Sequence, residues 1–265
     1  MMRGLCAGWG IANRPAVMGI VNTQVAYILH KRSYRETSSI VDVLTKDFGR
    51  LSLMARSSRG PRSKTAGNLL QFTPLVVSWQ GKGEMPNLKT AERADIKAPD
   101  LKKRSLLVAM YINELLTYML HKHDVHEDVF EHYHHTLYEL QDDGGLEIAL
   151  RKFEIKLLEL LGFGLNIERE ADSGESIKPG RFYEYHLEYG PVSCSDSPTD
   201  NDSRIPRVSG HCLLALSANR YDMISGDAGY LAELKQLMRF VIAHHLGNKK
   251  LKSRELFRPV AARLR

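Results

Sequence analysis

The sequence predicts an α+β protein in which a small β-barrel comes first and a helical domain follows. Short apolar segments with partial period-two alternation fill residues 20–98, whereas the apolar residues of 99–265 recur at helical spacing. Residues 165–210 interrupt the helical pattern with a stretch rich in Ser, Asp, Gly and Pro. This stretch is expected to form a small irregular insertion in the helical domain.

Five strands are expected in the first region, each rich in Val, Ile, Leu and aromatic residues. Their sequences are TQVAYILH, SSIVDVLT, GRLSLMAR, TPLVVSWQ and NLKTAER. Five strands in so short a region, without a strong helix between them, indicate a barrel closed on itself. The OB-fold is the commonest barrel of this count and size, so residues 20–98 are predicted to form one.

Four helices are expected in the second region. The first follows Pro99, with Asp100 as its N-cap. The others are VHEDVFEHYHHTLYELQ, GGLEIALRKFEIKLLELLGFG and YLAELKQLMRFVIAHHL. Gly162 and Gly164 are expected to end the third helix, and Gly247 is expected to end the last.

Residues 1–19 are left outside the predicted fold. Their apolar stretch is too short and their leading cations are too few for a signal peptide, so they are either a disordered extension or the result of a misassigned start. No run of about 18 apolar residues predicts a membrane span. The three cysteines are too few and too scattered for a secreted disulfide framework. A cytoplasmic, nucleoid-associated protein is expected.

The net charge of +6 is unevenly distributed along the chain. Residues 1–98 carry a net +9, residues 99–248 a net −9, and residues 249–265 a net +6. Two basic regions therefore flank an acidic one. This asymmetry predicts an anionic polymer as the partner of the basic regions.

The positive charge is most concentrated in residues 49–64, GRLSLMARSSRGPRSK, which hold five basic residues and no acidic one. Alternation directs Leu51, Leu53 and Ala55 into the barrel, and Ser52 points outward with the flanking arginines. A solvated face normally mixes charge signs, whereas this one repels itself unless an anion neutralises it. The predicted DNA-binding residues are Arg50, Arg56, Arg59, Arg62 and Lys64. The alternative is a flexible, soluble loop.

Aromatic residues of the barrel region are candidate platforms on which bases would stack. They are Tyr27, Tyr34, Phe72 and Trp79, although residues of this kind more often belong to the core.

A second basic cluster lies near the C-terminus, in GNKKLKSRELFRPVAARLR. Its predicted DNA-binding residues are Lys249, Lys250, Lys252 and Arg254. The alternative is a solvated helix that docks by its apolar residues.

A candidate peptide site lies in the third predicted helix. Arg151 shares a helix face with Ile155 and Leu158, and Lys152 is adjacent. A cation beside an apolar strip can receive a peptide that ends in an apolar residue and a carboxylate. The alternative is an arginine whose aliphatic stem covers the core.

The sequence contains few patterns that would indicate catalysis or metal binding. The segment HKHDVHEDVFEHYHH is rich in histidine but lacks the two-histidine metalloprotease pattern. The sequence contains no GxxxxGK[ST] motif, no GxGxxG motif after a strand and no CxxC pair. No catalytic residue, metal site or cofactor is therefore predicted, although scattered carboxylates leave a metal-dependent nuclease open as a further alternative.

Several segments, taken together and in order, resemble the RecO family of bacterial recombination mediators. They are YRETSSIVDVLTKDFGRLSLMARSSRGPRS, LLQFTPL, YINELL, LRKFEIKLLELLGFG and LGNKKLKSREL. The resemblance implies an N-terminal OB-fold, a helical domain and no enzymatic active site. It also implies binding to single- and double-stranded DNA, strand annealing, contact with the C-terminal tail of the single-stranded DNA-binding protein SSB, and loading of RecA together with RecR.

By this resemblance Arg56, Arg59, Arg62 and Lys64 lie in the family's DNA-binding loop. Arg151 lies in the helix associated with capture of the SSB tail.

The sequence departs from the family after the LGFG segment. Many relatives carry two CxxC pairs that bind zinc there, whereas this chain reads LNIEREADSGES and then PVSCSDSP, with Cys194 alone. A degenerate, zinc-free insertion is expected, either held by other contacts or partly mobile. An adaptor whose acidic helical domain binds proteins, with DNA binding incidental, remains the alternative function.

Overall fold

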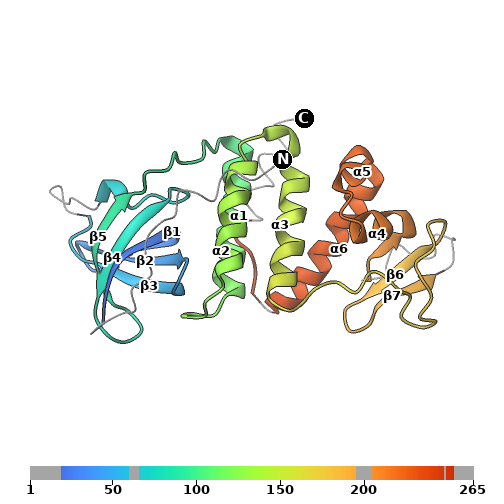
Figure 1. Ribbon diagram of the computed structural model, residues 1–265, viewed down its shortest axis with the longest axis horizontal. Helices are drawn as coiled ribbons and strands as arrows, with labels where there is room; N and C mark the ends of the chain where they lie inside the picture. Colours follow the sequence, from blue (N-terminus) through green and yellow to red (C-terminus); the bar gives the residue numbers. More distant parts are fainter. Residues whose placement is uncertain (1–18, 60–65, 195–204, 248, 254–265) are drawn as a thin grey trace. The chain divides into compact units, whose positions relative to one another are not determined.

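The computed structural model describes residues 19–59, 66–194, 205–247 and 249–253. The chain forms two compact units. Unit 1 takes in the residues up to 143 together with those from 251 onward, and unit 2 consists of residues 144–250. This division differs from the expected boundary near residue 99 because the first two helices pack on the barrel (Figure 1).

Five strands form the barrel of unit 1. They are β1 (Ile20–Tyr34), β2 (Ser38–Thr45), β3 (Gly49–Ala55), β4 (Leu75–Gln80) and β5 (Asn87–Arg93). Their order is β1-β2-β3-β5-β4, with β4 paired again to β1. The pair β3–β5 is parallel, consists of Met54 opposite Asn87, and closes the barrel. A five-stranded barrel of this order is an OB-fold, and the α+β class is confirmed.

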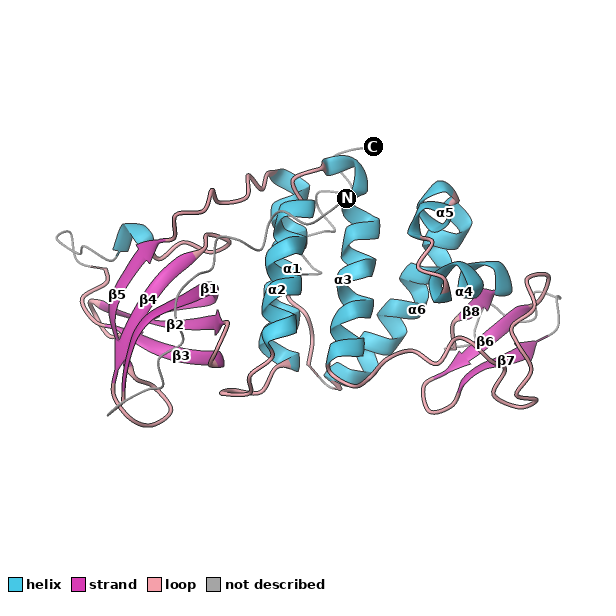
Figure 2. Ribbon diagram, viewed as in Figure 1, coloured by secondary structure: helices cyan, strands magenta, loops and turns pink. Residues whose placement is uncertain are grey.

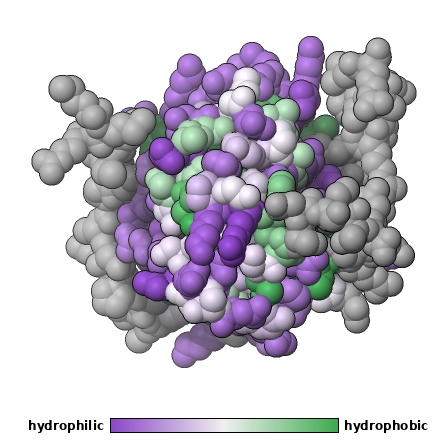
Figure 3. Space-filling model, turned by 90° about the vertical axis from the view of Figure 1, so that its right-hand side faces the viewer, coloured by the Kyte–Doolittle hydropathy of each residue, from purple (hydrophilic) through white to green (hydrophobic). Residues whose placement is uncertain are grey.

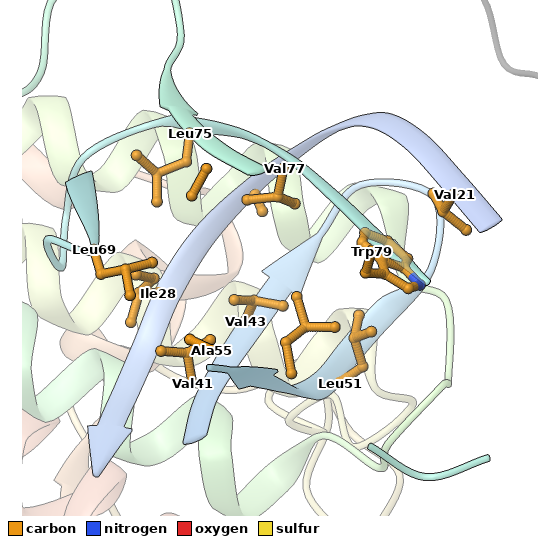
Figure 4. Packing of buried hydrophobic residues seen from close by; sticks show 13 residues of the cluster. Val21, Ile28, Val41, Val43, Leu51, Ala55, Leu69, Leu75, Val77 and Trp79 are labelled. Carbon is orange, nitrogen blue, oxygen red and sulfur yellow. The ribbon is translucent and has the colours of Figure 1, made fainter. Parts of the chain in front are cut away.

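Apolar side chains from all five strands fill the barrel. Leu53 and Leu75 are fully buried and belong to the same cluster as Val43 and Leu51. Figure 4 shows Leu75, Val43 and Leu51 in the space that the strands enclose. Leu69, which follows the short 3-10 helix η2 (Ala66–Asn68), joins the same cluster. Burial of this cluster is the main stabilising contribution in unit 1.

The predicted aromatic platforms belong mostly to the interior. Tyr27, Phe72 and Trp79 are buried and present no ring face to solvent. Tyr34 is half-buried and lies at the end of β1. Of the four aromatic candidates, only Tyr34 is partly exposed.

The outer face of β1 is covered by α1 (Lys103–Met119) and α2 (Glu127–Glu139). Tyr27 lies on this face, and its ring contacts those of Phe130 and Tyr133 of α2. The side-chain amide of Asn113 in α1 donates a hydrogen bond to the carbonyl of Leu29 at 3.0 Å. This part of β1 is therefore buried on both faces, which explains why its sequence reads as a nearly continuous apolar run.

Two details of unit 1 differ from the sequence expectation. Ser52 points away from the barrel core but is buried, and its hydroxyl donates a hydrogen bond to Asp42. The predicted N-cap, Asp100, is wrong because α1 begins at Lys103. The hydroxyl of Ser105 accepts a hydrogen bond from the backbone N–H of Lys102 at 2.8 Å and so completes the start of the helix.

The contact between β1 and α2 contains a buried histidine. Nδ1 of His134 lies 2.6 Å from the hydroxyl of Tyr27. Burial lowers the pKa of His134, the neighbouring His135 lowers it further, and Glu131 opposes the shift. The folded protein therefore favours the neutral imidazole.

Unit 1 is expected to lose stability as the pH falls below about 6.5, the ordinary histidine pKa. The unfolded chain binds a proton at His134 in this range more readily than the folded chain does. Urea unfolding followed at pH 7 and pH 5 measures the effect. His134→Gln is expected to reduce the difference between the two pH values, and an unchanged difference would assign the pH dependence to other groups.

Unit 2 combines helices with a three-stranded sheet (Figure 2). The 3-10 helix η3 (Asp143–Gly145) leads into its first helix, α3 (Leu146–Leu160). The other elements are β6 (Phe182–His186), β7 (Gly190–Cys194), β8 (Arg207–Ser209), α4 (Gly210–Ser217), α5 (Tyr221–Gly226) and α6 (Ala228–Leu246). The three strands form an antiparallel sheet in the order β7-β6-β8.

The face of unit 2 that carries the small sheet mixes hydrophilic and hydrophobic residues at its surface (Figure 3). Exposed apolar residues of this unit include Phe163, Tyr189 and Met223. No helix in the described part of the chain is long and apolar enough to span a membrane.

Candidate nucleic-acid interface

The first strand of the barrel extends beyond the core and carries exposed basic residues. His30 to Ser33 are exposed and pair with Asp42 to Ser39 of β2. The strand predicted from the sequence, TQVAYILH, ends at His30. The signal that this prediction missed is the run KRSYR, which places three cations, Lys31, Arg32 and Arg35, on one hairpin.

The end of β3 lies beside this hairpin. Ala55 of β3 is opposite Ser39 of β2. The hydroxyl of Ser58 donates a hydrogen bond to that of Ser39 at 3.0 Å, and the backbone N–H of Arg59 donates one to the carbonyl of Thr37 at 2.9 Å. These contacts bring Arg56 and Arg59 next to the hairpin.

We call the exposed cations of these two segments the basic edge. They are Lys31, Arg32, Arg35, Arg56 and Arg59. Among the residues that the structure describes, none of the five forms an ion pair with a carboxylate. By contrast, Lys46 at the opposite end of the β2 strand pairs with Glu127 at 3.1 Å and Glu131 at 2.8 Å. The positive charge of the basic edge is therefore left for an external anion.

Arg50, predicted as a DNA contact, has a partner inside unit 1. Its Nε donates a hydrogen bond to the carbonyl of Leu120 at 3.0 Å, and its own carbonyl accepts one from the N–H of His123 at 2.8 Å. Burial lowers the pKa of Arg50, and the charge of Asp42 opposes this shift. The side chain joins β3 to the end of α1, so we leave it out of the basic edge.

Three predicted DNA-binding residues, Arg62, Lys64 and Arg254, lie outside the described residues. Lys249, Lys250 and Lys252 are exposed, the first two in unit 2 and the third in unit 1.

The start of the C-terminal segment is fixed to α1 by a single carboxylate. Glu114 accepts hydrogen bonds from the N–H of Lys252 at 2.9 Å and from the N–H of Ser253 at 2.8 Å. The hydroxyl of Ser253 adds a third hydrogen bond at 2.6 Å. Leu251 is buried beside this anchor.

On α3, two of the residues predicted to bind a peptide, Arg151 and Leu158, are buried. Arg151 pairs with the fully buried Glu154. Lys152 is accessible and lies over the ring of Tyr221 at 5.4 Å, and Ile155 is half-buried. Of the two predicted cations, Lys152 is thus the more accessible.

The segment after α3 is built around a buried carboxylate. The hydroxyls of Ser173 and Tyr183 donate hydrogen bonds to Glu170 at 2.8 and 3.0 Å, and Arg181 approaches it at 3.7 Å. Both oxygens of Glu170 are thus engaged by protein donors. Cys212 contacts the carbonyl of Tyr230 at 3.6 Å, and burial raises the pKa of its thiol to about 12.

This donor set does not suit a structural zinc site. Zinc in such sites takes thiolates or imidazoles, and it binds a thiol only in its deprotonated form. In the described part of the chain, no group of three or more His, Cys, Asp or Glu side chains could hold a metal ion. The contacts of Glu170 hold this segment in the described structure.

Comparison with known proteins gives one consistent family. The model described as "Recombination protein O N terminal" matches residues 18–96, and "Recombination protein O C terminal" matches residues 103–255. The chain is similar to proteins named DNA repair protein RecO, for example that of Methylococcus capsulatus, with 43% identity over 88% of this chain and 91% of the relative. The one of Nitrosococcus oceani is 40% identical over the same shares, and the one of Dechloromonas aromatica is 39% identical over 90% of this chain and 96% of the relative. The chain therefore belongs to the RecO family of DNA repair proteins.

Proposed function

We propose that this chain binds single- and double-stranded DNA through its basic edge and acts as a recombination mediator without catalysing a bond change. The observation that carries the proposal is the basic edge itself, five exposed cations without carboxylate partners among the described residues. They lie on an OB-fold, a barrel that commonly binds nucleic acids through its strands and connecting loops. Membership of a DNA repair family supports the same function.

Charge neutralisation is the proposed basis of strand annealing. Two complementary strands repel each other through their phosphates, and a protein that neutralises phosphates with Lys and Arg releases the condensed counterions. Tyr34 is partly exposed among the cations and could stack on a base by the ring face that Arg35, 5.3 Å from the ring centroid, leaves uncovered. Because these contacts are with the phosphates of the DNA backbone, the affinity should be nearly independent of base sequence.

Titration of a labelled single strand at several salt concentrations tests this proposal. If all five cations contact phosphates, log affinity should fall with log salt at a slope of about −3.5. The same protein should accelerate annealing of complementary strands. A slope near zero would contradict phosphate-dominated binding, and magnesium-dependent cleavage of the strand by clean protein would contradict a role without catalysis.

Partner binding through unit 2 is the finer part of the proposal. We assign the SSB tail to the surface of α3 around Lys152 and Ile155, because Arg151 already neutralises Glu154. A tail that ends in an apolar residue and a carboxylate matches a cation beside an apolar side chain. RecR, and RecA indirectly, are the further expected partners, and no cofactor is proposed.

A peptide with the SSB tail sequence tests this assignment and separates it from the adaptor alternative. Lys152→Ala is expected to weaken binding several-fold, as is amidation of the peptide's terminal carboxylate. Lys156→Ala is the matched control, since Lys156 pairs with Glu159 at 2.7 Å. Peptide binding without DNA binding would favour an adaptor, and equal effects of the two variants would move the peptide site elsewhere.

A further inference from the structure

Arg59, in the turn that follows β3, donates hydrogen bonds to the whole turn of the β1–β2 hairpin. The backbone N–H of Arg59 donates to the carbonyl of Thr37 at 2.9 Å. Its guanidinium donates to the carbonyls of Arg35 and Glu36. All three carbonyls of the turn thus accept hydrogen bonds from the same residue.

The two turns joined by these contacts both contain a residue in the left-handed region. Arg35 has φ of 51° and Ser57 has φ of 50°. For residues other than glycine this conformation is uncommon and costs free energy, so it persists only where surrounding contacts determine it. The hydrogen bonds of Arg59 and the buried pair Ser58–Ser39 are such contacts.

Apart from the backbone pairing of β1 with β2, the hairpin has few contacts that would hold it. Beyond Leu29 the strand leaves the core, and the side chains from His30 to Ser33 are exposed. Segments with few buried apolar contacts open locally at low free-energy cost. The orientation of the hairpin cations therefore depends on hydrogen bonds, both those of the strand pairing and those at the tip.

We propose that Arg59 is a positioning residue: it fixes the β1–β2 turn to the end of β3, so that the hairpin cations Lys31, Arg32 and Arg35 meet DNA in one orientation. This inference rests on the proposed function. Three of the five guanidinium N–H groups of Arg59 remain for other acceptors, because the contacts with Arg35 and Glu36 use one terminal nitrogen. The main effect of Arg59 on DNA binding is nevertheless indirect, because Arg59 orients the cations of the hairpin.

Arg56 provides the matched comparison. It is exposed and belongs to the same segment, but no hydrogen bond connects its side chain to the hairpin among the described residues. Arg56 should thus behave as a simple phosphate ligand whose effect adds to that of any other cation.

A double-mutant cycle tests the inference. Arg59→Ala is expected to weaken binding of single-stranded DNA about tenfold in the wild-type background, because a preorganised surface is lost. In a background with Lys31, Arg32 and Arg35 replaced by alanine, it should cause almost no further loss. Arg56→Ala should cause the same fold loss in both backgrounds. Equal losses for Arg59→Ala in both backgrounds would overturn the inference and make Arg59 a direct phosphate ligand.

Arg59→Lys separates charge from geometry. Lysine keeps the positive charge but lacks the planar fork, so it should restore little of the lost affinity. Full restoration would show that charge alone matters and would overturn the inference.

Limited digestion with trypsin gives a readout that does not require DNA. Cleavage after Lys31, Arg32 and Arg35 reports opening of the hairpin, and Arg59→Ala should accelerate it about tenfold while Arg56→Ala leaves it unchanged. If the wild-type protein fails to bind DNA, the proposed function is wrong, but digestion still tests whether Arg59 holds the β1–β2 turn. If binding occurs but digestion rates are equal, the positioning role fails alone.

Discussion

Replacing Lys31, Arg32 and Arg35 together by alanine is expected to weaken binding of single-stranded DNA on the order of 100-fold at 0.1 M salt. Each phosphate contact on a single strand contributes about 0.7 to the slope of log affinity against log salt, so three contacts account for about 2. The slope should become less negative by that amount. Fluorescence anisotropy with a labelled oligonucleotide measures both quantities.

The matched control for this variant removes the same charge elsewhere in unit 1. Lys97, Lys103 and Arg104 are exposed and lie at or near the start of α1. Their joint replacement by alanine lowers the net charge equally but should change the slope little. Equal effects of the two triple variants would mean that net charge, rather than the basic edge, determines affinity.

Gly49→Ala is expected to destabilise unit 1 by about 3–5 kcal/mol. Gly49 has φ of 64°, and an added Cβ would lie 1.9 Å from the carbonyl oxygen of Asp124. The connection between α1 and α2 would have to move away from β3, with loss of the hydrogen bond between His123 and Arg50. Urea unfolding measures the change, with the buried Trp79 as the fluorescent probe in a Trp9→Phe background.

A substitution at a second glycine distinguishes the steric clash of the added Cβ at position 49 from the strain of a positive φ. Gly83 also has positive φ, 95°, but an added Cβ there meets no atom within 4 Å. Gly83→Ala should cost only the backbone contribution, about 1–2 kcal/mol. If Gly49→Ala costs no more than Gly83→Ala, the approach of Asp124 does not constrain this position.

The barrel could be predicted from the sequence because its strands are short, apolar and separated by polar turns. The same reasoning failed where hydrogen bonding rather than burial maintains a strand. Residues 31–34 continue β1 because they pair with β2, although none of their side chains joins the core cluster. A pattern of apolar residues cannot reveal such an extension. The hairpin cations were thus missed although their run is visible in the sequence.

In unit 2 the sequence predicted the long helices but not how their charged residues pair. Arg151 stands beside apolar positions, and the acid three residues later, Glu154, is the signal that its charge is neutralised inside the fold. The short helices α4 and α5 were missed because Ser, Asn and Gly surround them and neither is long enough to show a clear period.

The anchor at Glu114 has a consequence for the order in which the protein is completed during synthesis. Unit 1 consists of two stretches of chain, and the whole of unit 2 lies between them. The barrel and its two helices leave the ribosome first, yet the carboxylate of Glu114 receives the N–H groups of Lys252 and Ser253 only after unit 2 has been made. The domain that is begun first is therefore the last to be finished.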